Sequence, residues 1–275
     1  MPAGSRSRRI DGPVVPSVAP LCWSCARLVP PPVREFLEDI GLWGWARTRW
    51  RLASLRTGRW THFIGRRLQP ISRKSGFDRG LPIDRYYIER FLAAHAVDIA
   101  GRVLEFAADD YTVKFGGGRV TQSDVLEVVE GNRKATIVAD LTNADQISSD
   151  TFDCIICTQT LQMIFDLRAA VVHLHRILRP GGVLLATTHG TAKIGRRIGR
   201  DAWGEYWRLT GQSAERLFGD VFQPQNVRVE PHGNVWAATA FLYGLAAEEL
   251  KPGDLEYLDP DYELLITIRA VKDPA

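Results

Sequence analysis

The sequence predicts an α/β fold: a doubly wound, mostly parallel sheet of seven strands with helices on both faces. From Gly101 onward, short apolar runs alternate with helical stretches, and strands joined through helices form parallel sheets by right-handed crossovers. Acidic residues also stand in or just after the first three runs, at the sheet edge where such folds bind ligands. The 275 residues are enough for one large domain with an appendage.

The chain ahead of this pattern has a different composition. Residues 1–32 are rich in Pro, Ser and Arg and are predicted to be disordered. Residues 33–82 are predicted to form a basic, Trp/Arg-rich helical extension or cap that ends in an extended connection over 70–82. The α/β domain is expected to span residues 83–275.

Charge is distributed unevenly between these parts. Residues 1–80 carry fifteen Lys and Arg against five acids, a net +10, so the remainder carries −7 of the total of +3. Five of the eight Trp also lie in the first sixty residues. A basic, Trp-rich segment of this kind suits a membrane surface, a protein partner or the acidic body of its own chain. The opposite charges favour contact of the basic segment with the acidic body of the same chain. No nucleic-acid partner is expected.

Several classes of protein are disfavoured. No apolar run reaches the ~18 residues of a membrane span, and the N-terminus lacks the uninterrupted apolar stretch of a signal peptide. Four cysteines without a secretion signal indicate free thiols in a reducing compartment. The expected location is therefore the cytoplasm.

The elements are predicted in order from periodicity and from helix and turn signals. A helix is expected over 83–96, and the later helices over 167–178, 213–222 and 235–250. Thr210 is expected to cap the helix that follows it. The helix over 167–178 is expected to stop at Arg179-Pro180-Gly181-Gly182, because Pro ends helices and Gly permits tight turns. The predicted strands are 101–107, 119–125, 135–141, 151–159, 183–190, 227–231 and 262–271.

Three carboxylates near strand ends indicate the ligand. Asp124, expected to end the second strand, can accept both hydroxyls of a ribose. Asp140, after the third strand, can accept a hydrogen bond from the exocyclic amine of adenine. Glu105, in the first strand, suits a cationic ligand or holds the turn that follows. Together they suggest an adenosine ligand that carries positive charge.

A family resemblance rests on five segments. Residues 101–271 resemble the class I S-adenosylmethionine-dependent methyltransferases, including bacterial enzymes that act on small molecules or sugars. The segments are VLEFA (103–107), SDV (123–125), VADL (138–141), FDCIICTQTLQMI (152–164) and HRILRPGGVLLAT (175–187). The last is the most specific.

The resemblance implies S-adenosylmethionine as cofactor and S-adenosylhomocysteine as product. It assigns cofactor contacts to the turn after the first strand, to the second strand (ribose), to the third strand (adenine) and to the fourth strand (methionine). In that order the implied residues are Glu105, Ala107 and Asp109; Asp124 and Val125; Asp140 and Leu141; Thr158 and Gln159.

One segment departs from the family pattern. The family's acidic, Gly-rich turn is replaced by Glu105-Phe106-Ala107-Ala108-Asp109-Asp110-Tyr111, which contains no glycine. The link to the second strand is also short, and Gly116-Gly117-Gly118 is expected to provide a tight return. This departure leaves two alternatives to methyl transfer: a non-catalytic protein that binds partners, or an enzyme of another reaction type, such as a cyclase.

The expected reaction is methyl transfer to an oxygen or nitrogen of a small polar metabolite, such as a sugar or natural-product intermediate. His189, after the fifth strand, is a candidate general base. Glu205 and Tyr206 are further candidates, within a segment over 203–210 that is expected to cover the substrate.

No metal is expected. Cys154 and Cys157 form one Cys-x-x-Cys pair, but residues three apart in a strand point to opposite faces. Cys22 and Cys25 form the other, an isolated pair in the N-terminal segment, which is a weak signal for zinc.

Overall fold

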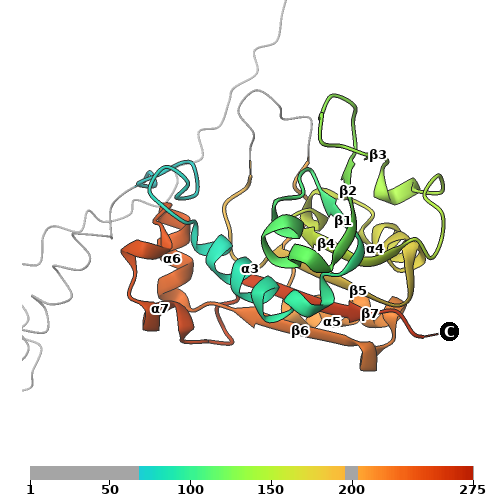
Figure 1. Cartoon of the computed structure of the whole chain (residues 1–275). Helices are drawn as coiled ribbons and strands as arrows, with labels where there is room; N and C mark the ends of the chain where they lie inside the picture. Colours follow the sequence, from blue (N-terminus) through green and yellow to red (C-terminus); the bar gives the residue numbers. More distant parts are fainter. Residues whose placement is uncertain (1–67, 196–203, 275) are drawn as a thin grey trace, which may run out of the picture. The chain divides into compact units, whose positions relative to one another are not determined.

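The computed structural model describes residues 68–195 and 204–274 (Figure 1). The predictions for residues 1–67, which include the Trp/Arg-rich extension and Cys22 and Cys25, lie outside the described residues. Residues from Gln69 onward form one compact unit. The backbone N–H groups of Ile71 and Ser72 donate to the carbonyl of Tyr243 at 2.8 and 3.1 Å. Residues 69–82 therefore belong to the compact unit that begins at Gln69.

The sheet has seven strands in the order β3-β2-β1-β4-β5-β7-β6. Neighbouring strands are parallel from β3 to β5, and β7 runs antiparallel to both β5 and β6. This arrangement confirms the predicted α/β class with a mostly parallel sheet. The strands are β1 (Gly101–Phe106), β2 (Val120–Glu127), β3 (Ile137–Val138), β4 (Phe152–Thr158), β5 (Leu178–His189), β6 (Val227–His232) and β7 (Leu265–Val271).

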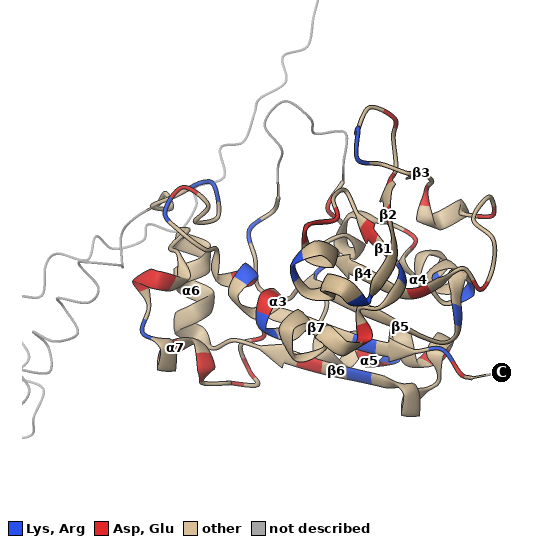
Figure 2. Cartoon of the chain, in the orientation of Figure 1, with Lys and Arg blue, Asp and Glu red and all other residues tan. Residues whose placement is uncertain are grey.

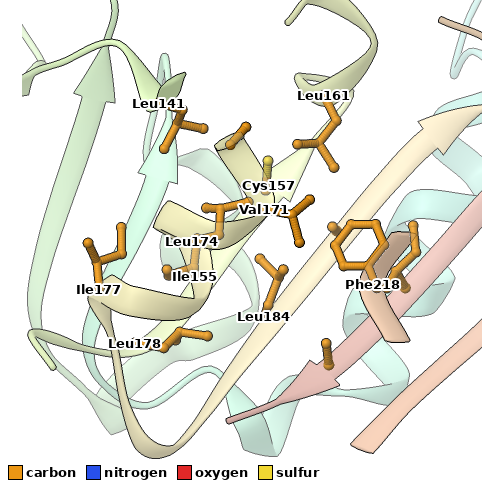
Figure 3. Close-up of a cluster of buried hydrophobic side chains, with 14 of the residues drawn as sticks. Leu141, Ile155, Cys157, Leu161, Val171, Leu174, Ile177, Leu178, Leu184 and Phe218 are labelled. Atoms are coloured by element: carbon orange, nitrogen blue, oxygen red, sulfur yellow. The ribbon is translucent and has the colours of Figure 1, made fainter. Parts of the chain in front are cut away.

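Helices cover both faces, as predicted (Figure 1). They are α3 (Ile83–Ala94), α4 (Leu167–Ile177), α5 (Gly211–Phe222), α6 (Val235–Tyr243) and the short α7 (Pro252–Glu256). Leu174 of α4 and Phe218 of α5 share a buried cluster with Ile155 of β4 (Figure 3). The next residue along β4, Ile156, belongs to the other buried cluster, with α3 and α6. Successive side chains of β4 point to opposite faces of the sheet, so they pack alternately into the two buried clusters.

The buried cysteines follow the same alternation. Cys154 lies in one cluster and Cys157 in the other, which confirms that their side chains occupy opposite faces. Both are free thiols. Burial raises the pKa of the Cys157 thiol to about 12 and that of Cys154 further still.

The two largest differences from the predicted boundaries are at β5 and α6. β5 begins at Leu178 and includes the Arg-Pro-Gly-Gly segment, because a register shift between Phe152 and Cys154 accommodates the extra residues on β5. Helix α6 ends at Tyr243 and not at Leu250, because Gly244 takes a left-handed conformation (φ 74°) that caps it. Thr210 does cap α5, accepting the N–H of Ser213 at 3.2 Å.

The link between β1 and β2 contains only short helical turns. A five-residue π-turn (Thr112–Gly116) and a 3-10 turn (Gly117–Arg119) join β1 to β2, and Gly117 has a φ of 56°. The link is therefore short, as predicted. Within the described part of the chain, no helix is both long and apolar enough to cross a membrane.

Candidate active site

A cavity of about 860 Å³ opens where β1, β2 and β3 end. One end is formed by the ends of these strands and the residues just after them. The other is formed by segments 160–166, 194–195 and 204–206. Its lining comprises Phe106, Ala107, Leu126, Glu127, Val128, Ala139, Asp140, Leu141, Thr142, Thr160, Met163, Ile164, Phe165, Asp166, Ile194, Gly195, Gly204, Glu205 and Tyr206. Its volume falls in the range of small-molecule sites, roughly 300–1,000 Å³.

Glu105 holds the turn that follows β1. Its buried carboxylate accepts the backbone N–H of Tyr111 at 3.2 Å, and both the N–H and the hydroxyl of Thr112 at 2.7 Å. Burial raises its pKa above the usual range despite these bonds. Of the two roles considered for Glu105, the structure shows the one of holding the turn, and Glu105 is not among the lining residues.

Ala107 lines the cavity in the left-handed conformation that a glycine would adopt freely. Its φ is 64°, which costs an L-residue roughly 1–2 kcal/mol. Its N–H donates to the carbonyl of Leu126 at 3.0 Å. Since its side chain is a single methyl group, the turn still leaves room beside its backbone.

Asp124 does not end β2, which corrects the sequence-based prediction. It lies inside the strand, is 5% exposed and is absent from the cavity wall. Its carboxylate is bound by Arg102 (2.7 Å), Thr136 (2.9 Å) and Gln122 (3.1 Å). These bonds tie β2 to Arg102 of β1 and to Thr136, the residue before β3.

Glu127 is the acid that ends β2. It is partly exposed and lines the cavity. The sequence interpretation missed it because the second strand was ended two residues too early, at Val125. Val125 itself is buried in the strand and outside the cavity. The signal that could have found Glu127 is the apolar pair Val125-Leu126, which extends the run.

Asp140 and Leu141 both line the cavity, as the sequence suggested for residues after the third strand. Asp140 is exposed and caps a 3-10 turn, accepting the N–H and hydroxyl of Thr142 at 2.8 Å. Leu141 is buried and provides an apolar surface. A carboxylate beside an apolar surface is the arrangement expected for an adenine ring with an exocyclic amine.

Three further predicted contacts lie outside the cavity wall. Asp109 forms an ion pair with Lys134 at 2.8 Å, which lowers the pKa of Asp109. Thr158 ends β4, and Gln159 follows it with a φ of 51°. The Gln159 N–H donates to the carbonyl of Thr187 at 3.0 Å, which joins the ends of β4 and β5.

The other end of the cavity contains Glu205 and Tyr206. The Glu205 carboxylate pairs with Arg208 at 2.6 Å and accepts the N–H of Gly195. The Tyr206 side chain is about half exposed, and its ring lies edge-on to Phe165 with centroids 5.3 Å apart. The Tyr206 N–H donates to the carbonyl of Gln162 at 2.8 Å. This end of the cavity is aromatic.

His189 ends β5, as expected, but it is not among the lining residues. Its side chain is 14% exposed, its Nε2 lies 3.4 Å from a carboxylate oxygen of Asp84, and its ring contacts Phe241. Its Nδ1 is buried without a hydrogen-bond partner among the described residues. The structure therefore places His189 outside this cavity, with its side chain against Asp84 of α3 and Phe241 of α6.

The sequence pattern of the methyltransferase domain family matches residues 84–186. No curated protein sequence matches the chain. Among solved structures, the [4+2]-cyclase SpnF is similar at 13% identity over 69% of this chain and 82% of that chain, with a TM-score of 0.46. A SAM-dependent methyltransferase from Archaeoglobus fulgidus is similar at 8% identity over 68% and 94%, also with a TM-score of 0.46.

A third similar structure is phosphoethanolamine N-methyltransferase 2 from Haemonchus contortus in complex with S-adenosyl-L-methionine. It is 14% identical over 70% of this chain and 57% of that chain, with a TM-score of 0.44. With TM-scores under 0.5 these similar structures carry no argument about this chain, and the domain assignment comes from the match over residues 84–186. The match over residues 84–186 agrees with the resemblance drawn from the sequence, and the mostly parallel seven-stranded sheet is the fold that the resemblance implied.

Proposed function

We propose that the chain transfers a methyl group from S-adenosylmethionine to an oxygen or nitrogen of a small polar metabolite. The observation that carries this proposal is a single cavity with two chemically different ends. Carboxylates and apolar side chains lie where β1–β3 end, and a carboxylate with aromatic rings lies at the other end. Such a cavity can hold a cofactor and an acceptor side by side.

The residues at the strand ends fit an adenosine group. Glu127 replaces Asp124 as the carboxylate that accepts the two ribose hydroxyls, because it ends β2 and lines the cavity. Asp140 accepts from the adenine amine, and Leu126, Leu141 and Ile164 provide apolar walls for the ring. The bound cofactor supplies a methyl group already activated on a positively charged sulfur.

The opposite end receives the acceptor molecule. We assign to Glu205, which lines the cavity, the proton that the acceptor atom loses, and we assign to the rings of Tyr206 and Phe165 the stacking on a sugar or other polar ring. The protein contributes mainly by aligning the two molecules, by excluding water and by removing this proton. His189 is not among the lining residues, so Glu205 is preferred as the base.

Calorimetric titration of the whole chain with S-adenosylmethionine and S-adenosylhomocysteine tests the cofactor. Micromolar binding of both, followed by transfer of labelled methyl to sugars or other hydroxyl and amine acceptors, is the expected result. Failure of either compound to bind would contradict the proposal and favour a partner-binding protein. Binding without transfer to any acceptor would favour another reaction type.

A further inference from the structure

The turn that lacks glycines is tied to the loop that follows β2. The side-chain Nδ2 of Asn132 donates to the carbonyl of Ala107 at 2.7 Å and to a carboxylate oxygen of Glu127 at 3.3 Å. Lys134 reaches Asp109 at 2.8 Å and Asp110 at 3.0 Å. The loop over 128–136 carries both signs of charge (Figure 2). It therefore contacts the turn at three points.

These bonds fall where the turn is strained. Ala107 holds a left-handed φ of 64°, which glycine adopts readily and alanine does not. The N–H of Ala107 is held by Leu126 and its carbonyl by Asn132. External hydrogen bonds thus hold a conformation that a glycine would adopt without support.

The amide of Asn132 is fully used. Its two N–H groups face two acceptors, the Ala107 carbonyl and the Glu127 carboxylate, while its Oδ1 accepts the N–H of Lys134 at 3.0 Å. The reverse orientation of the amide would direct its oxygen at two other oxygens, so these partners fix the orientation. One side chain therefore joins the two cavity residues Ala107 and Glu127.

We propose that Asn132 is a positioning residue for the cofactor, which holds the Ala107 turn and orients the ribose-binding carboxylate of Glu127 in place of the missing glycines. This inference rests on the proposed function, since Glu127 is assigned to the ribose there. Lys134 supports the same turn through Asp109 and Asp110. Because Lys134 is more than half exposed, its contribution is the smaller one.

The test is the affinity of the whole chain for S-adenosylhomocysteine, measured by calorimetry. Asn132→Ala is expected to weaken binding about 10-fold, the worth of a hydrogen bond to a charged group. Asn132→Asp is expected to weaken it more, because it sets a second carboxylate against Glu127 and the Ala107 carbonyl. The matched control is Asn143→Asp, which adds the same charge at an exposed position just after Asp140 and Leu141. It is expected to bind like the wild type.

A rescue separates positioning from general stability. Ala107→Gly in the Asn132→Ala background is expected to recover part of the lost affinity, because glycine needs no support at this φ. In thermal unfolding without ligand, the two substitutions are expected to be non-additive, as for residues in contact. Equal binding by wild type and the Asn132 variants, or no recovery with Ala107→Gly, would overturn the positioning role alone. Absence of binding by the wild type would instead overturn the proposed function, and the positioning role with it.

Discussion

The carboxyl edge of the sheet has an open half over β1–β3, which lines the 860 Å³ cavity, and a closed half over β5, β7 and β6, against which α3 packs beside a smaller cavity of about 350 Å³. On the open half, the last residues of β1 and β2, Phe106 and Glu127, line the cavity. On the closed half, His189 and His232 both pair in register with Leu265, so the three lie in one row. Helix α3 covers this row.

The cover consists of specific contacts. Asp84, in the first turn of α3, lies 3.4 Å from His189, and Tyr87, one turn later, stacks on His232 with centroids 5.5 Å apart. The comparison teaches that a place at the end of a strand does not by itself make a residue part of the site. What packs over that strand end decides it.

The largest expected effect is on cofactor binding, and it distinguishes the roles of the two acids of β2, Glu127 and Asp124. Glu127→Ala should weaken S-adenosylhomocysteine binding about 1,000-fold, because two hydrogen bonds from ribose hydroxyls to a charged group are lost. Asp124→Asn should leave binding within a few-fold but lower the free energy of unfolding by about 2 kcal/mol, because Arg102 loses its buried partner. Calorimetry and chemical denaturation measure the two quantities. If Asp124→Asn weakened binding strongly and Glu127→Ala did not, the ribose would be assigned to Asp124 instead.

The next effect compares the candidate bases of the two halves. Glu205→Gln should lower turnover about 100-fold, the usual range for a general base, with cofactor affinity unchanged. His189→Gln should lower turnover no more than about threefold, because His189 is not among the lining residues and its side chain contacts Asp84 of α3. Steady-state rates with a working acceptor decide between them. A large loss in the His189 variant alone would show that the closed half opens during turnover.

The smallest effect is on stability at low pH and concerns the closed half. Burial lowers the pKa of His232 below its usual value of 6.5, so the unfolded chain takes up a proton at this site before the folded chain does. The free energy of unfolding should therefore fall as the pH drops below about 6.5. His232→Gln should flatten this part of the profile in denaturation at several pH values. An identical slope in the variant would assign the loss to other groups, such as the histidines at 95 and 175, whose pKa burial also lowers.

Periodicity was sufficient for most of the fold. All seven strands and the four longer helices occur within a few residues of their predicted positions, except where Gly244 ends α6 early and where β5 takes in the Arg-Pro-Gly-Gly segment. The errors are at boundaries, because a register shift or a left-handed cap depends on which neighbours the backbone meets. Neither the register shift nor the left-handed cap can be predicted from the spacing of apolar residues.

The site was predicted less completely. Five of the named residues line the cavity: Asp140, Leu141, Ala107, Glu205 and Tyr206. The other named residues do not: Glu105, Asp109, Asp124, Val125, Thr158, Gln159 and His189. A shift of two residues at the end of β2 exchanges a buried carboxylate for one that faces the cavity. Glu105 was placed near the correct turn, but only its bonds to Tyr111 and Thr112 show that it holds the turn.

The sequence by itself determined the order of the elements, the two-faced core and the resemblance to methyltransferases, because these depend on local periodicity and short segments. Tertiary structure decided which strand ends remain open. Asn132 meets Ala107 across twenty-five residues, and Asp84 meets His189 across more than a hundred. Such contacts depend on where the chain returns in space, which no local pattern specifies.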